Sequence, residues 1–177
     1  MNAELNLLIT DIDLLGTGGL SSREPRYCAR AVPFTEDGVV LLHVEKFDFY
    51  TLPGGGVEDG ETMEEACVRE VKEETGYPCE IMQRLGVVTE NSAYSDYHFI
   101  SFGFTVNITG ERGAQNLTLE EEEERTRVVI LEPDEALKKL SGQTIVNEDE
   151  RMRLIMEFIR KRDAAFLAAS LLIKMNQ

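Results

Sequence analysis

The sequence predicts an α+β fold in which helices and a sheet pack as a sandwich. Strand-like segments come first, a helix with clear ends lies in the middle, and helices close the chain. At 177 residues the chain is long enough for one domain with a sizeable core. Its 42 % apolar and 29 % charged residues are ordinary for a globular protein, which excludes a disordered, collagen-like or membrane-embedded chain.

The chain begins with a segment that we expect to form an arm. Apolar and polar residues alternate from Leu5 to Leu14 as in a half-buried strand, and the Gly- and Ser-rich stretch 16–22 is typical of a connector. We therefore divide a single domain into an arm (1–25), a core (26–145) and a C-terminal helix (146–177).

The core is expected to open with a β-hairpin. Two apolar, β-rich runs, 27–34 and 39–45, flank an Asp-Gly turn at Asp37 and Gly38. A short third strand over 47–52 ends at a Pro-Gly-Gly-Gly sequence. Further strands are expected over 79–88, 97–108 and 127–131.

Three helices are expected. Residues 61–75 are rich in Glu, Ala, Met and Lys and are followed by Gly76, which stops a helix. A short helix should run from Pro133 to Leu140. Asn147 and Glu150 resemble a capping box that starts the last helix.

The end of the last helix is apolar from Ala164 to Ile173. Ten residues are too few to span a bilayer, so we expect a packing surface or the interface of a homodimer. Three cysteines match neither a disulfide framework nor a metal knuckle, and no positively charged leader precedes Arg23. These features favour the cytoplasm.

The net charge of −15, from 33 acids against 18 bases, opposes attraction to a phosphate backbone and excludes a general nucleic-acid binder. The charge is concentrated in two places. Residues 54–77 hold eight acids against two bases, a net of −6, and Glu120 to Glu124 add −5. Such local acidity is typical of a site or a tail.

Three of these acids share one face of the expected helix. At 100° per residue, Glu70, Glu73 and Glu74 fall in a sector of about 100°. The same stripe carries Met63, Ala66 and Cys67, so it should face the protein. The opposite side carries Thr62, Glu65, Arg69 and Lys72 and is expected to face solvent.

Carboxylates crowded on a partly buried stripe need protons or cations. Unit charges ~4 Å apart repel by ~4 kcal/mol even at a dielectric constant near 20. An all-oxygen donor set selects Mg²⁺ or Mn²⁺, and zinc is disfavoured without paired His or Cys. Arg69 is spaced to reach Glu73 at i+4 as an orienting partner.

The stretch from Gly55 to Tyr77 resembles the signature of the Nudix hydrolases, G-x5-E-x7-R-E-U-x-E-E-x-G-U, in which U is a bulky apolar residue. Every fixed position is filled, with Tyr77 where an aliphatic residue is more common. The resemblance implies a Nudix-type α/β/α sandwich with a mixed central sheet. Its loop–helix–loop would hold Mg²⁺, or Mn²⁺, against a pyrophosphate.

The resemblance also implies roles. Metal ligands would be Glu70, Glu74 and the carbonyl of Gly54, with Glu73 a ligand or base, Glu61 an outer partner or base, and Arg69 an orienting cation. The expected reaction is hydrolysis of a nucleoside diphosphate linked to another group, by attack of an activated water on phosphorus.

Other candidates are less sharply defined. Family members often carry a loop glutamate before the strand 127–131, and Glu122, the centre of the five-Glu run, is our arbitrary choice. Arg30 could contact phosphate or balance nearby acids. Tyr50 and Tyr94 could stack on a base, although aromatic residues in strands more often belong to the core.

Two other functions fit the same sequence. A nucleotide-sensing module could keep the fold without turnover, although the filled signature argues against it. A prenyl diphosphate isomerase would keep the metal helix and release no phosphate.

Overall fold

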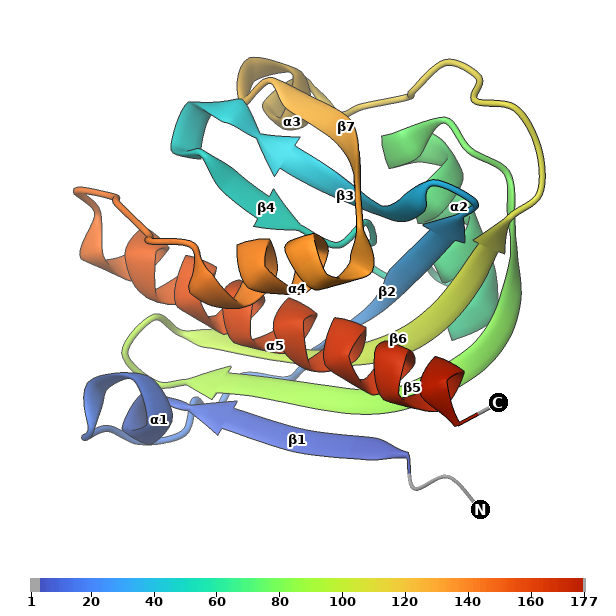
Figure 1. The fold of residues 1–177 in the computed structure, drawn as a ribbon. Coiled ribbons are helices and arrows are strands. Elements are labelled where there is room, and N and C mark those ends of the chain that lie inside the picture. Colours follow the sequence, from blue (N-terminus) through green and yellow to red (C-terminus); the bar gives the residue numbers. More distant parts are fainter. Residues whose placement is uncertain (1–3, 177) are drawn as a thin grey trace.

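The structure is a computed structural model that describes residues 4–176. These residues form seven strands (Figure 1). In chain order the elements are β1 (Leu5–Thr10), α1 (Asp11–Leu15), β2 (Arg26–Thr35), β3 (Gly38–Val44), the 3-10 turn η1 (Glu45–Phe47), β4 (Phe49–Thr51), α2 (Met63–Thr75), β5 (Cys79–Ser92), β6 (Tyr97–Ile108), α3 (Leu119–Glu123), β7 (Thr126–Leu131), α4 (Pro133–Gly142) and α5 (Glu150–Met175).

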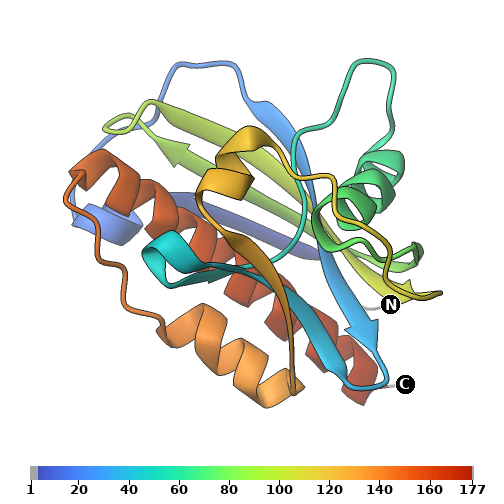
Figure 2. The ribbon, with the colours of Figure 1, turned by 90° about the horizontal axis from the view of Figure 1, so that it is seen from above.

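The strands form one mixed sheet in the order β1-β5-β6-β2-β3-β4, with β7 pairing with β3 outside this path. The β1–β5 and β2–β6 pairs are parallel, and the other pairs are antiparallel. Helix α2 covers one face of the sheet, and α4 and α5 cover the other (Figures 1 and 2). The predicted α/β/α sandwich with a mixed central sheet is therefore confirmed.

Alternation along β2 supplies both hydrophobic cores. Ala29 and Ala31 belong to the cluster beneath α2, and Val32 and Phe34 belong to the larger cluster beneath α4 and α5. All four side chains are buried. The sheet is thus packed on both faces, and the two helical layers do not share a core.

The predicted hairpin is shorter than the sequence indicates. Only two residue pairs at the turn join β2 to β3, after which β3 continues alongside β7 and β4. The reason is that the segment 53–57 lies beside β2, where backbone hydrogen bonds link Ala31 to Pro53, Ala29 to Gly55, and Val57 to Tyr27. This segment contains the first residues of the signature, which begins at Gly55. Because the two hairpin strands separate beyond the turn, the segment can pair with β2.

Three local predictions differ from the structure. The alternating pattern stops at Thr10, because the Thr10 N–H and hydroxyl both donate to Asp13 and start α1. Helix α5 is capped by Asp149, which accepts from the N–H of Met152, and not by Asn147. The five-Glu run is not a plain loop, since Thr118 caps the short helix α3 there.

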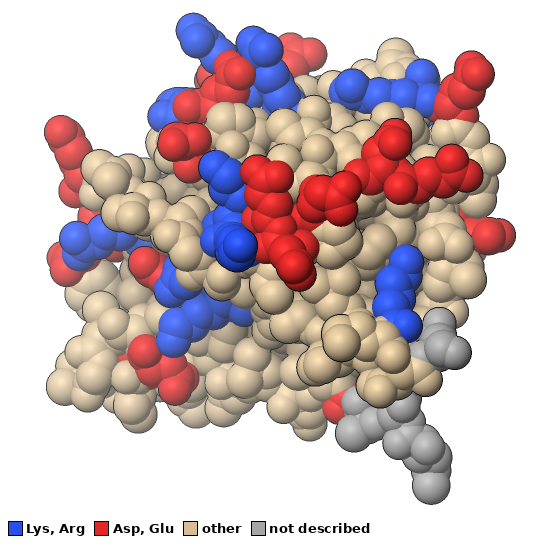
Figure 3. Space-filling model, in the orientation of Figure 1, with Lys and Arg blue, Asp and Glu red and all other residues tan. Residues whose placement is uncertain are grey.

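Residues 4–176 contain no helix with both the length and the apolar character that a bilayer crossing requires. On the face drawn in Figure 3, acidic side chains gather in several groups, with Lys and Arg side chains between them.

Candidate active site

Helix α2 is fixed at both ends by local contacts. The Thr62 hydroxyl accepts from the N–H of Glu65, and the Glu65 carboxylate accepts from the N–H of Thr62. The helix ends at Gly76, whose φ of 77° lies in the left-handed region. Ala66, Cys67 and Val71 are buried against the sheet, so the face predicted to point inward does so.

Two glycines allow the loop before α2 to approach its neighbours. Gly54 has a φ of 142°, and a Cβ atom there would clash with the carbonyl of Ala29. A Cβ atom on Gly55 would clash with the carboxylate of Glu70. The backbone of this loop therefore touches both β2 and the acidic face of α2.

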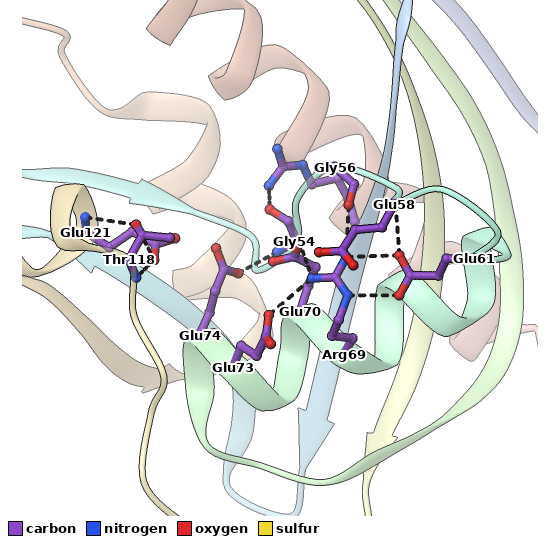
Figure 4. Close-up of polar contacts among 11 residues, drawn as sticks. Gly54, Gly56, Glu58, Glu61, Arg69, Glu70, Glu73, Glu74, Thr118 and Glu121 are labelled. Atoms are coloured by element: carbon purple, nitrogen blue, oxygen red, sulfur yellow. Dashed lines mark hydrogen bonds and ion pairs between the residues drawn. The ribbon is translucent and has the colours of Figure 1, made fainter.

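Arg69 joins the loop to the helix through all five of its N–H groups (Figure 4). Its Nε and Nη2 donate to both oxygens of Glu61 at 2.8 and 3.0 Å. Its Nη1 donates to Glu70 at 2.8 Å and to Glu73 at 3.1 Å, and Nη2 also donates to the carbonyl of Gly56 at 2.9 Å.

The pairing of Arg69 with Glu73 that the i+4 spacing predicts is present, but the placement of Arg69 on the solvent face was wrong. The residue leaves α2 on that side, and its long side chain folds back over the carboxylates. Only 24 % of the side chain is exposed.

Glu74 is the most deeply buried acid of α2, with 8 % of its surface exposed. Its Oε2 accepts a hydrogen bond of 2.6 Å from the N–H of Gly54. Burial raises the pKa of Glu74 well above its ordinary value, and the charges of Glu70 and Glu121 act in the same direction, while Arg30 opposes them. Burial also raises the pKa of Glu70.

These groups fit a hard divalent cation in chemistry but are not assembled around one. Over residues 4–176, no three His, Cys, Asp or Glu side chains lie close enough together to hold a metal ion as they stand. The reason is visible in the contacts, because Arg69 engages Glu61, Glu70 and Glu73, and Glu74 is turned to Gly54. A cation among these oxygens would offset the free-energy cost of burying the charged carboxylates of Glu70 and Glu74.

Arg30 is the one substrate-binding candidate that the structure brings to this site. It extends from β2, and its Nη1 donates to the carbonyl of Gly54, the same carbonyl that the Nudix resemblance assigns to the metal. Its Nε is buried without a hydrogen-bond partner among the described residues.

The remaining candidates have partners elsewhere. The Tyr50 ring stacks on His43, with ring centroids 4.3 Å apart. Tyr94 is 54 % exposed, and its hydroxyl donates to Glu150 at the start of α5. Glu122 is exposed on α3, whereas Glu121 of the same helix acts on the pKa of Glu74. In Figure 4, Glu121 lies on the side of Glu74 away from Glu61.

Sequence reasoning missed a buried charged cluster next to the loop. Asp163 of α5 accepts hydrogen bonds from the Thr51 hydroxyl and the Leu52 N–H, and it also pairs with Arg162. Arg162 in turn pairs with Glu90 of β5. The available signal was an Arg-Asp pair directly before the apolar run that begins at Ala164.

Comparison with known proteins identifies the family. Residues 24–148 match the family model described as the NUDIX domain, so the chain belongs to the Nudix family. The match contains the loop, α2, α3 and α4. It begins at residue 24, near the end of the arm, and it ends before α5.

Two curated relatives match part of the chain. An ADP-ribose pyrophosphatase of Methanocaldococcus jannaschii is 46 % identical over 61 residues, 34 % of this chain and 36 % of the relative. A putative 8-oxo-dGTP diphosphatase of Bacillus subtilis is 38 % identical over 72 residues, 41 % of this chain and 46 % of the relative. The matched region thus spans less than half the length of either relative.

The fold is shared with solved structures. A Nudix hydrolase from Nitrosomonas europaea superposes with a TM-score of 0.56 at 21 % sequence identity, covering 79 % of this chain and 91 % of that one. At this identity the likeness shows the sandwich fold alone.

Proposed function

We propose that this protein is a Mg²⁺-dependent hydrolase that cleaves the diphosphate linkage of a nucleotide or of a nucleoside diphosphate joined to another group. The observation that supports it most is the pair of buried carboxylates, Glu70 and Glu74, held against Gly54 and Gly55. Mn²⁺ suits the same oxygens. When bound, the metal supplies an activated water and offsets charge on the phosphoryl oxygens.

We assign the proposed roles of these residues from their positions in the site. Glu70, Glu74 and the Gly54 carbonyl are the proposed metal ligands. Glu73 and Glu61 are the candidate bases, because each has a carboxylate whose orientation Arg69 fixes. From the five-Glu run we favour Glu121 over Glu122, since the charge of Glu121 is felt by Glu74.

Arg30 is the proposed contact to a substrate phosphate. Its guanidinium lies at the Gly54 carbonyl, and its charge lowers the pKa of both Glu70 and Glu74. Release from that carbonyl would leave a planar donor group facing the anionic substrate. Tyr50 and Tyr94 are not included, because their contacts lie elsewhere.

The substrate class is tested by a product screen. The printed names of the relatives include hydrolases of ADP-ribose and of 8-oxo-dGTP, so both compounds belong in the panel, with nucleoside triphosphates, nucleotide sugars and dinucleoside polyphosphates. We expect Mg²⁺-dependent release of a monophosphate or pyrophosphate from at least one of them.

The same screen, with a prenyl diphosphate added to the panel, separates the two rival functions. Nucleotide binding without metal-dependent turnover would favour a sensing module. Rearrangement of a prenyl diphosphate with no phosphate product would favour an isomerase.

We infer a reducing compartment such as the cytoplasm, because the three cysteines are free and two of them are buried. A homodimer is also proposed, on the exposed apolar side chains of Leu172 and Met175 at the end of α5. Light scattering of the purified chain tests the dimer, and a monomeric mass would contradict it.

A further inference from the structure

We propose that Asp163 of α5 is a positioning residue for the hydrolysis, which acts through Thr51 and Leu52 to hold the peptide of Gly54 in place. The inference rests on the proposed function, in which the Gly54 carbonyl is a metal ligand. It goes beyond the family, since α5 lies outside the matched residues 24–148.

The carboxylate of Asp163 is fully buried, and both of its oxygens accept hydrogen bonds. Its Oδ2 accepts from the Thr51 hydroxyl at 2.6 Å and from the Leu52 N–H at 2.9 Å. Its Oδ1 accepts from Nε of Arg162 at 2.7 Å. Hydrogen bonds to a charged acceptor are among the strong ones in proteins. The last residue of β4, Thr51, is therefore strongly bound to α5.

Only Pro53 separates this tie from Gly54. The Pro53 carbonyl accepts from the N–H of Ala31 at 2.9 Å, and its ring fixes φ. The Gly54 N–H then donates to Glu74, and its carbonyl accepts from Arg30. Asp163 belongs to α5 and Glu74 to α2, and these helices cover opposite faces of the sheet (Figure 2), so the segment is held from both faces.

The charges behind Asp163 are not needed to attach α5. Phe158, Phe166 and Leu167 already bury the helix in the main core. Burial disfavours the charge of Arg162, but the carboxylates of Asp163 and Glu90 outweigh it and raise the pKa of Arg162, which therefore stays charged. Buried ion pairs stabilise little compared with apolar packing, so we assign this cluster to positioning.

The chain offers a matched pair of substitutions. Thr51→Val removes the hydroxyl that donates to Asp163 and keeps the shape of the side chain. Thr105→Val removes a similarly short hydrogen bond, of 2.7 Å, between β6 and Ser170 of α5, which joins α5 to a strand other than β4. Substitution of Asp163 itself is less informative, because it removes the carboxylate that pairs with the buried charge of Arg162.

The test measures metal affinity, amide exchange and turnover in both variants. With Thr51→Val we expect Mn²⁺ binding, followed by electron paramagnetic resonance, to weaken by about three- to tenfold. The amides of Leu52 and Gly54 should exchange with deuterium faster, and the loss of activity should recover at saturating Mg²⁺. Thr105→Val should lower the melting temperature alone.

The outcomes separate this inference from the proposed function. If the wild type turns over substrate and the two variants have equal Mn²⁺ affinity and equal exchange at Gly54, the positioning role of Asp163 is wrong. If the wild type binds no Mn²⁺ and hydrolyses nothing in the panel, the proposed function fails, and the positioning role fails with it.

Discussion

The carboxylate of Glu74 accepts a hydrogen bond of 2.6 Å from the backbone N–H of Gly54, and this contact joins the last turn of α2 to the loop before the helix. Both groups are buried. The contact places the Glu74 carboxylate close to the Gly54 carbonyl and to a second carboxylate, Glu70, and the charge of Arg30 only partly opposes the resulting rise in the pKa of Glu74. Burial of these carboxylates is costly, and under the proposed function a bound metal would offset that cost.

Glu74→Gln tests that balance. Because burial raises the pKa of Glu74, its ionised form destabilises the fold above the ordinary pKa of a glutamate, and stability returns as pH falls through the raised value. In EDTA at pH 7.5 the variant should melt at or above the wild-type temperature, since a neutral amide can still accept from Gly54.

With Mg²⁺ the order should reverse. The wild type should gain melting temperature and the Glu74→Gln variant should not, and its activity should fall by at least about 100-fold. Glu64→Gln is the control, because Glu64 lies on the same helix and is exposed. A variant at Glu74 that keeps the Mg²⁺-induced shift would contradict its role as a ligand.

Arg69→Lys should lower kcat by about 10- to 100-fold with the fold preserved. A lysine has one ammonium group and cannot bind both oxygens of Glu61 while also reaching Glu70 and Glu73. Steady-state kinetics and circular dichroism together provide the test. Arg84→Lys, an exposed substitution on β5, should change neither, and equal activity of the two variants would remove the orienting role of Arg69.

Gly55→Ala should displace Glu70 without straining the backbone. The new Cβ atom meets the Glu70 carboxylate, and φ at Gly55 is not in the left-handed region. We expect activity to fall by about 10- to 100-fold, since small misplacements of catalytic groups are enough for such losses. Gly142→Ala in α4 meets no atom within 4 Å and should keep full activity.

The three thiols should be unreactive in the native protein. Burial raises the pKa of Cys79 to about 11, and it also raises the pKa of Cys28 and of Cys67, so the thiolate is scarce at pH 7.5. Alkylation by iodoacetamide, followed by mass spectrometry, should be slow in buffer and rapid in urea. Fast labelling of Cys67 in buffer would mean that α2 detaches from the sheet.

Local patterns in the sequence were enough to predict the acidic face of α2. The spacing of Glu70, Glu73 and Glu74 fixes their directions on any helix, and the structure places all three on the side that meets the loop. The same arithmetic misplaced Arg69, because it describes where a side chain leaves the helix and not where a long one ends.

Contacts between distant segments could not be predicted in this way. Asp163 and Thr51 are 112 residues apart, and neither stands out in its own segment. The start of α1 depends on one side-chain contact, between Thr10 and Asp13, which an alternating pattern does not reveal. Sequence reasoning therefore located the acidic face of the candidate site and missed the contact of Asp163 with Thr51 and Leu52.

The most direct test of the account is product release from the substrate panel by the wild type and by Glu74→Gln, each with Mg²⁺ and with EDTA. We expect monophosphate or pyrophosphate release by the wild type with Mg²⁺, release lowered by at least about 100-fold in the variant, and none in EDTA. Equal release by the variant, or no release by the wild type with either Mg²⁺ or Mn²⁺, would contradict it.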